Sequence, residues 1–251
     1  MSWYIGTSGF MINKDIWLKK SGLNCLEINY TFYRLPKAET VQKWKEYEDV
    51  SFVAKIPKKI THIKRLKDIE KYWDLFWSIM NLLEDKLKVV LFQLPPSFKL
   101  TDENIKRLKN LKKILPKKGI NIVFEFRDIS WFVPTVYKIM KKNNWGMAGT
   151  VIKKKEDDIS WLGTMPNGIL LPPQTSDLTY LRIHGAKKYK GAYDIKELKQ
   201  MQKEILNRKT KENFVLFNNT FFTSRSQYCL KGDVKIKSAA VCNAIEMKDL
   251  I

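Results

Sequence analysis

The hydrophobic segments of this chain share one pattern: the polar residues inside them occupy alternate positions. In residues 23–30, Glu27 and Asn29 lie two apart, whereas Leu26 and Ile28 occupy the opposite positions. Because side chains alternate across a β-strand, such a segment has one apolar face and one face that carries polar groups. The pattern therefore predicts a strand with polar side chains near its C-terminal end.

The same arrangement recurs in four later segments, always toward the C-terminal end of the segment. The polar residues concerned are Lys55, Gln93, Glu125 with Arg127, and Arg182 with His184. A barrel of parallel strands produces this pattern, because helices cover its outside and the active-site residues gather at the C-terminal ends of its strands. We therefore expect these side chains to meet at one mouth of a barrel.

Strand and helix patterns alternate along the whole chain, which is typical of repeated βα units. The expected strands are 3–7, 25–29, 52–56, 89–93, 122–126, 147–152, 180–184 and 214–217. The expected amphipathic helices are 40–47, 68–87, 101–115, 133–143 and 195–208. A length of 251 residues is usual for one such barrel. The sequence predicts one α/β domain over residues 1–251, a (β/α)8 TIM barrel with a closed, parallel, eight-stranded sheet.

The composition bears on the cellular compartment of the protein. The chain lacks a run of about 18 apolar residues and opens on a strand pattern, which argues against a membrane span and a signal peptide. The three cysteines, Cys25, Cys229 and Cys242, are odd in number and widely spaced. They favour free, buried thiols in a reducing compartment over disulfides or a zinc site. We expect a cytoplasmic protein.

The formal charge of +20 admits two interpretations. One is nucleic-acid binding, because clustered cations neutralise phosphates. The other is a lysine-rich composition without a binding role, because the lysines are scattered over expected helix surfaces. Arginine is rarer, with seven among the 46 basic residues, so its positions carry more information. Five arginines lie at or just beyond expected strand ends, namely Arg34, Arg65, Arg127, Arg182 and Arg225. This enrichment indicates an anionic ligand over the mouth, with structural salt bridges as the alternative.

The order of motifs resembles a known family. The motifs are Tyr4–Phe10, Leu26–Pro36, Lys55–Pro57 with Ile60–His62, Leu91–Phe98, Phe124–Asp128 with Ser130–Trp131, Arg182–Gly185 and Phe217–Asn219. Nearly the whole chain is similar to the domain of unknown function 72 family, the YecE-like proteins. The resemblance implies a TIM barrel with a polar pocket at its C-terminal mouth, and it supplies no reaction. It adds Tyr33, His62, Asn218 and Asn219 to the candidate pocket residues.

The candidate catalytic residues are two histidines and two carboxylates. His62 and His184 are the only histidines of the chain, and a histidine that titrates near neutrality is the usual proton carrier. Glu27 and Glu125 come from well-separated strands, and the cations beside them would keep both ionised, which argues against a glycosidase general acid. We predict no cofactor. A divalent metal ion stays open, because glutamate and histidine side chains at strand ends suit one, whereas the cations interleaved with them oppose metal binding.

We therefore expect an enzyme, a hydrolase or lyase that acts on a small anionic, phosphate-bearing substrate. The expected substrate-binding residues are Asn29, Tyr33, Lys55, Gln93, Arg127, Arg182, Asn218 and Asn219. The alternative is a binding protein without turnover, which recognises a nucleotide or nucleic acid through its basic surface. The expected contributors to that surface are Lys153–Lys155, Lys187, Lys188 and Lys190.

Overall fold

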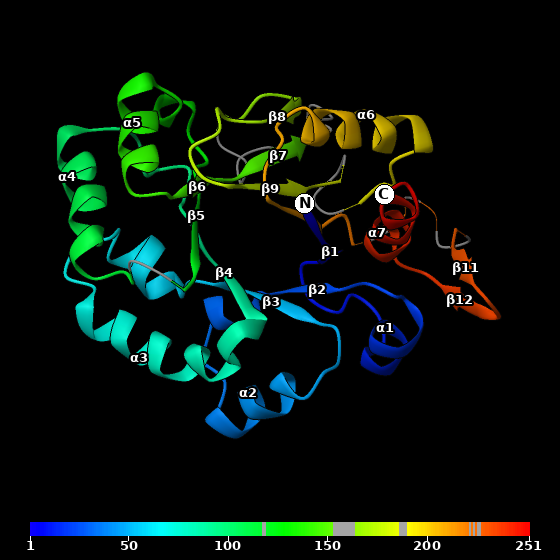
Figure 1. The fold of residues 1–251 in the computed structure, drawn as a ribbon. Helices are drawn as coiled ribbons and strands as arrows, with labels where there is room; N and C mark the ends of the chain where they lie inside the picture. The colour runs from blue at the N-terminus through cyan, green and yellow to red at the C-terminus, as the bar shows by residue number, and fades with distance from the viewer. Residues whose placement is uncertain (117–118, 153–163, 186–189, 221, 223, 225–226) are drawn as a thin grey trace.

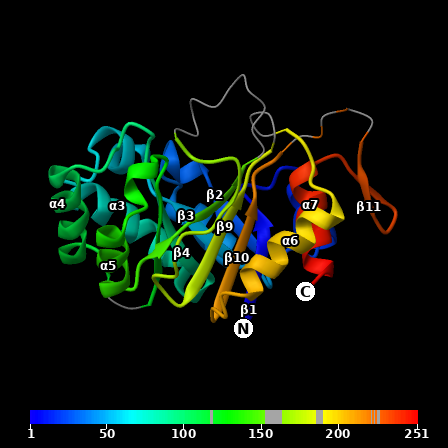
Figure 2. The same cartoon turned by 90° about the horizontal axis from the view of Figure 1, so that it is seen from above.

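The computed structural model describes residues 1–251 except 117–118, 153–163, 186–189, 221, 223 and 225–226. Strands and helices alternate, and a curled sheet carries the helices on its outside (Figures 1 and 2). The strands are β1 (Ser2–Thr7), β2 (Cys25–Ile28), β3 (Ser51–Lys55), β4 (Leu87–Gln93), β5 (Asn121–Glu125), β6 (Gly146–Met147), β7 (Gly149–Ile152), β8 (Gly168–Leu170), β9 (Leu178–Ile183) and β10 (Glu212–Phe217). Their order in the sheet is β6-β5-β4-β3-β2-β1-β10-β9-β7-β8.

The sheet is mostly parallel and TIM-barrel-like, but it differs from the closed eight-stranded barrel that the sequence predicts. The expected strand 147–152 is divided at Ala148 into β6, which pairs with β5, and β7, which pairs with β9. An additional strand, β8, pairs antiparallel with β7 and ends the sheet. The α/β class is confirmed, whereas the strand number and the continuous parallel ladder of the prediction are wrong.

Each helix lies close to an expected position or fills a gap that the pattern left. The described helices are α1 (Lys14–Lys20), α2 (Ala38–Lys45), α3 (Glu70–Met80), α4 (Asp102–Asn110), α5 (Pro134–Lys142), α6 (Ile195–Leu206) and α7 (Ala239–Asp249). Short 3-10 turns follow α3 and α4, and a π-helical turn, η2 (Lys59–Ile63), follows β3. No helix in the described part of the chain has the length and apolar character needed to cross a bilayer.

Local sequence signals explain where several helices begin. The Thr101 hydroxyl accepts a hydrogen bond from the Asn104 backbone at the start of α4, at 3.2 Å. Asp194 and Glu197 form a reciprocal capping box at the start of α6. Such caps satisfy backbone N–H groups that have no partner within the helix. Helix α7 was not expected, because it is buried around most of its circumference and therefore lacks a polar stripe.

The two faces of the strands carry different layers, as the alternation predicts. Residues such as Leu26, Phe124 and Ile183 belong to the large core between the sheet and the helices. The opposite face holds a second apolar cluster, composed of Cys25, Val53, Val89, Leu91, Val123, Ala148, Leu178, Tyr180, Phe214 and Leu216. Each strand continues from this inner cluster to a polar residue two positions later. The inner apolar layer is thus the floor on which the polar residues lie.

The cysteine prediction is wrong for two of the three residues. Cys229 and Cys242 form a disulfide, with their Cα atoms 5.8 Å apart, whereas Cys25 is a buried free thiol. The bond joins α7 to a hairpin of β11 (Cys229–Lys231) and β12 (Val234–Ile236), which projects from the sheet in Figure 1. The chain folds back over 13 residues here, and spacing alone does not reveal that approach. The expectation of a reducing, cytoplasmic setting loses this support and stays a prediction.

Candidate functional site

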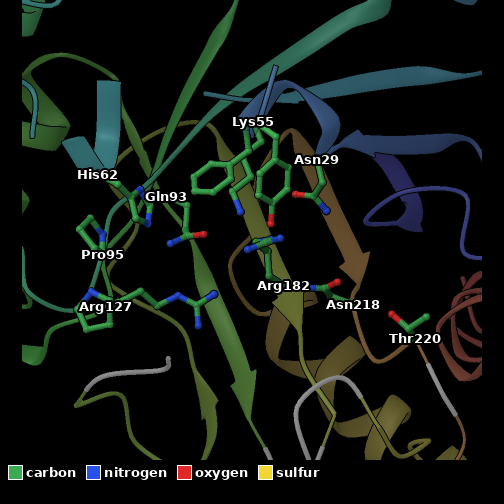
Figure 3. Close-up of a pocket in the computed structure, with 12 residues that line it drawn as sticks. Asn29, Lys55, His62, Gln93, Pro95, Arg127, Arg182, Asn218 and Thr220 are labelled. Atoms are coloured by element: carbon green, nitrogen blue, oxygen red, sulfur yellow. The ribbon is translucent and has the colours of Figure 1, made fainter. Parts of the chain in front are cut away.

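The site forms where strands from distant parts of the sequence end side by side. Lys55, Gln93 and Glu125 are the last residues of β3, β4 and β5, and Arg182 is the penultimate residue of β9. A cavity of about 490 Å³ opens above them. It is lined by Asn29, Phe32, Tyr33, Lys55, His62, Gln93, Pro95, Pro96, Arg127, Arg182, Asn218 and Thr220. Figure 3 shows Lys55, Arg127 and Arg182 pointing toward its centre from three sides.

Arg182 holds the floor of the cavity together. Its Nη2 lies 2.6 Å from Glu27 Oε1, and its Nη1 lies 2.6 Å from Glu125 Oε2. Arg127 Nη2 pairs with the second oxygen of Glu125, and the Tyr180 hydroxyl donates to Glu27 Oε2 at 2.8 Å. All five side chains are buried, with at most 3% of each exposed. One guanidinium therefore joins carboxylates of β2 and β5, which the sequence places far apart.

The two carboxylates lie beneath the cavity and do not belong to its described lining. Burial by itself raises the pKa of Glu125, but Arg127, Arg182, His184 and Lys55 outweigh that effect and hold the pKa well below its usual value. Glu125 is consequently ionised at neutral pH and cannot act as a general acid. Its oxygens orient Arg127 and Arg182, whose remaining surface faces the cavity.

His184 does not have the environment of a proton carrier. It is fully buried, and burial, Arg127 and Arg182 hold its pKa well below the usual value. Its Nε2 lies 3.3 Å from Arg127 Nη2 and must accept that hydrogen bond, since a guanidinium only donates. The imidazole is therefore neutral. Burial and the neighbouring arginines thus shift the pKa of His184 away from the neutral range that the sequence led us to expect, and its catalytic role stays a prediction.

His62 does line the cavity, but it also titrates below neutrality. Burial and the charges of Lys55, Arg65 and Arg127 lower the pKa of His62 to about 4. Its Nδ1 is hydrogen-bonded to the Thr61 hydroxyl at 2.9 Å. At neutral pH the ring is a neutral hydrogen-bonding group on the cavity wall.

Lys55 is the residue of the lining whose titration approaches neutrality. Burial lowers the pKa of Lys55 to about 8, assisted by Arg182 and Arg127 and opposed by Glu27 and Glu125. Its ammonium nitrogen lies 4.4 Å from the centre of the Phe32 ring. The sequence identified Lys55 as a ligand-binding cation and did not reveal this shift, which depends on residues from three other strands.

The remaining predicted residues divide between the cavity and its surroundings. Asn29 and Asn218 line the cavity, and Tyr33 forms its rim with 72% of the residue exposed. Asn219 is buried away from the cavity, where its amide donates to Gly191 and Asn243. Of the strand-end arginines, Arg65 bonds to the Ser97 hydroxyl, and Arg225 lies outside the described residues. Asn219 is therefore a structural residue of the α7 side of the fold.

Several residues of the site were not anticipated as functional. Phe32 lines the cavity, with its ring centre 4.4 Å from the Lys55 ammonium nitrogen. Thr220 lines the side opposite His62 (Figure 3). Tyr180 lies beneath the floor and was expected only as a strand residue. Its position in the strand was the signal that could have identified it, because Tyr180 and Arg182 are two residues apart and therefore point to the same face. Phe32 ends the 3-10 turn η1 (Tyr30–Phe32) and Thr220 lies in a loop, so the alternation of a strand gives no direction for either.

No group of three or more histidine, cysteine or carboxylate side chains suited to a metal ion occurs in the described ranges. Both floor carboxylates already bind guanidinium groups, which compete with a cation for the same oxygens. The divalent metal ion that the sequence left open stays an untested prediction.

Comparison with known proteins agrees with this architecture. The sequence model of the family described as "Protein of unknown function DUF72" matches residues 17–230. The UPF0759 protein YunF of Bacillus subtilis is 27% identical, over 86% of this chain and 88% of its own length. The UPF0759 protein YecE of Escherichia coli is 35% identical over 30% of this chain and 28% of its own length.

Solved structures have similar folds, to different degrees. A crystal structure of a DUF72 family protein from Thermotoga maritima has a TM-score of 0.76, with 24% identity over 100% of this chain and 99% of that chain. The IOLI protein, crystallised with a bound zinc atom, has a TM-score of 0.50 and 13% identity over 87% of this chain and 88% of that chain. At these identities the likeness concerns the fold, and it carries neither substrate nor metal to this chain.

Proposed function

The chain belongs to the DUF72 family, whose description names no reaction. From the chemistry of its pocket we propose that the protein is a hydrolase or lyase that acts on a small anionic, phosphate-bearing substrate. The charge balance of the site is the observation that supports this proposal. Among the described residues of the cavity and its floor, Lys55, Arg127 and Arg182 supply three formal positive charges, and Glu27 and Glu125 supply two negative ones, which leaves one positive charge in excess among these five. Burying an uncompensated charge is costly, so an anionic ligand would complete the site.

The carboxylates also favour this interpretation over a purely structural network. They contact the guanidinium groups from below, and thereby fix Arg127 and Arg182 in one orientation while their other edges face the cavity. Planar guanidinium groups held in this way suit two oxygens of a phosphate or carboxylate. The side chains of Asn29, Gln93 and Asn218 line the wall, and their amide oxygens can accept hydrogen bonds from the uncharged part of the substrate.

The roles of the proposed catalytic residues follow from their burial. Glu27, Glu125 and His184 lie behind the arginines and act as positioning residues. Proton transfer is assigned to Lys55, because its pKa of about 8 allows both protonation states near neutral pH. His62 is a neutral hydrogen-bonding partner of the substrate.

Arg127 provides the test of anion binding. We expect Arg127→Ala to weaken binding of inorganic phosphate and pyrophosphate about 10- to 100-fold, the value of a hydrogen bond to a charged group. Isothermal titration calorimetry at constant ionic strength measures the affinity. Arg107→Ala is the matched control, because Arg107 pairs with Glu103 on α4 and does not line the cavity. Equal phosphate affinity in wild type and Arg127→Ala would refute the anion site.

A second candidate function rests on a separate groove beside the cavity. The groove has a volume of about 310 Å³, and Phe32 and Tyr33 line both hollows. Cations lie over its aromatic rings, with Lys58 5.9 Å from the Tyr33 ring centre and Lys59 5.6 Å from that of Tyr72. Aromatic faces that alternate with cations suit a nucleotide base and its phosphates. The alternative function is therefore nucleotide or single-stranded nucleic-acid binding without turnover.

This second candidate predicts a strong dependence on salt. If the groove's cations neutralise about three phosphates, the affinity for a short oligothymidylate should fall about 20-fold between about 50 and about 200 mM salt. We expect Tyr33→Ala to weaken binding, whereas Tyr228→Ala should not, although Tyr228 is also exposed beneath a lysine. Fluorescence anisotropy measures both effects. Salt-independent affinity would contradict a phosphate-based interface. The expected contributors Lys153–Lys155, Lys187 and Lys188 lie outside the described residues.

A further inference from the structure

Lys55 differs from the other two cations of the cavity in its partners. Arg127 and Arg182 both pair with buried carboxylates. Within the described residues, the Lys55 ammonium has no ion pair or hydrogen bond, and its nitrogen lies over the face of the Phe32 ring. It nevertheless lies at the C-terminal end of β3 and points into the cavity (Figure 3). The cavity wall therefore contains a half-buried amine with which no described residue forms an ion pair or hydrogen bond.

This environment disfavours the protonated form of the amine. Burial removes water from the ammonium group, and Arg182 adds repulsion that Glu27 and Glu125 only partly offset. With a pKa of about 8, roughly one molecule in ten carries a neutral Lys55 amine at pH 7, a few hundredfold more than for an ordinary lysine. A neutral amine is a nucleophile, whereas an ammonium group is not.

A lysine whose sole task is to attract an anion would not need this arrangement. That task is served best by a fully charged, hydrated side chain, and an arginine serves it without any change of protonation. Here the two arginines hold the carboxylates, and the lysine is kept apart from them against the aromatic ring. Desolvation beside other cations is the arrangement that activates a lysine for attack on a carbonyl carbon.

We propose that Lys55 forms a covalent Schiff base with an anionic, phosphate-bearing aldehyde or ketone. This proposal rests on the proposed anion site and specifies its substrate class. The lone pair of the neutral Lys55 nitrogen forms a bond to the carbonyl carbon, and a proton passes from nitrogen to the carbonyl oxygen, which gives a carbinolamine. A proton from solvent water in the open cavity is added to that hydroxyl, the C–O bond breaks, and loss of one water leaves an iminium ion.

The surrounding charges suit each stage of this step. Arg127 and Arg182 hold the phosphate of the substrate throughout. The iminium nitrogen carries the same positive charge that the ammonium form of Lys55 had, so the balance with Glu27 and Glu125 is restored once water leaves. An iminium draws electrons from the adjacent carbon and thereby favours cleavage of a bond to that carbon. The proposal therefore favours the lyase over the hydrolase, and addition of water to the iminium returns the free amine.

Reductive trapping tests the proposal directly. The probe is pyridoxal 5′-phosphate at about one equivalent per chain, followed by borohydride, which transfers hydride to the imine carbon and leaves a stable secondary amine. Peptide mass spectrometry of the wild-type protein then locates the adduct among its lysines. We expect Lys55 to be modified first, at least about tenfold faster than the exposed Lys109 of α4. The rate should rise with pH through about 8 and then level off.

Three controls separate the outcomes. Lys55→Met should lose the first adduct, Lys109→Arg should retain it, and circular dichroism establishes that both are folded. Pyridoxal without the phosphate should label Lys55 more slowly, and inorganic phosphate should protect it. Adducts spread over surface lysines without preference for Lys55 would overturn the Schiff-base proposal. If phosphate binding persists in that case, the anion site of the proposed function survives; if phosphate binding is also lost, both proposals fall.

Discussion

Replacing Arg182 with alanine is expected to lower the free energy of unfolding by about 3–5 kcal/mol at neutral pH. The variant leaves Glu27 without its guanidinium and leaves Glu125 with Arg127 alone, and both carboxylates are fully buried. A buried carboxylate that loses its partner still has the desolvation cost, but it no longer has the electrostatic attraction that offset this cost. Urea titration followed by circular dichroism measures the change.

The size of this effect should depend on pH. In the wild type the pKa of Glu125 is depressed, so its contribution to stability is complete above the unfolded value of about 4.3 and is lost only as the pH falls further. In Arg182→Ala, Glu125 stays buried but loses one of its two guanidinium partners, which raises its pKa. Protonation of Glu125 then removes part of the cost of burying its charge. The deficit of the variant should therefore shrink as the pH is lowered toward 4. A deficit that stays constant with pH would show that the loss comes from packing.

Two further variants isolate the charge. Lys211→Ala removes a surface ammonium paired to the exposed Asp177 and should change stability much less than Arg182→Ala does. Combining Arg182→Ala with Glu27→Gln removes one of the stranded charges and should recover part of the loss. No recovery in the double variant would contradict the charge-based explanation.

Replacing Gly6 with alanine is expected to have an equally large effect, for a steric reason. A Cβ added to Gly6 would lie 1.5 Å from the carbonyl oxygen of Cys25, which is its partner in the pairing of β1 with β2. The obstacle is backbone and cannot turn aside, so the two strands must separate. We expect a loss of more than about 4 kcal/mol, or no folded protein, because such values accompany disruption of a core element.

Gly9 supplies the matched control for this prediction. A Cβ there would meet nothing within 4 Å, although φ is +98°. Gly9→Ala should therefore cost only about 1–2 kcal/mol from the backbone conformation. Purified yield and denaturant unfolding of the two variants give the comparison. Equal stability of Gly6→Ala and wild type would show that β1 and β2 are not packed as described.

The effects at Arg182 and Gly6 come from different levels of organisation. Gly6 maintains the contact between β1 and β2 that places Glu27 at the floor of the cavity. Arg182 then uses that position to join β2 with β5 and β9. A functional variant of the site must preserve the first of these contacts, which is why we assign the binding test to Arg127, which lines the cavity and pairs with Glu125.

Much of this protein follows from its sequence by itself. Alternation within strands has a period of two, so the parity of Glu27, Glu125 and Arg182 determined the face they share. Repeated βα units determined the parallel order of most strands, because such units connect parallel neighbours. The residues of the cavity were largely identified in this way, including Lys55, Gln93 and Arg127.

The tertiary structure decided the properties that depend on distance and burial. It divided the sixth strand at Ala148, joined Cys229 to Cys242, and directed Asn219 away from the cavity. It also changed the chemistry of the site, since it buried His184 behind Arg127 and left Lys55 as the amine that titrates near pH 8. A pKa is set by the water that is excluded and by the charges that surround a group, and in this protein those charges come from strands far apart in the chain.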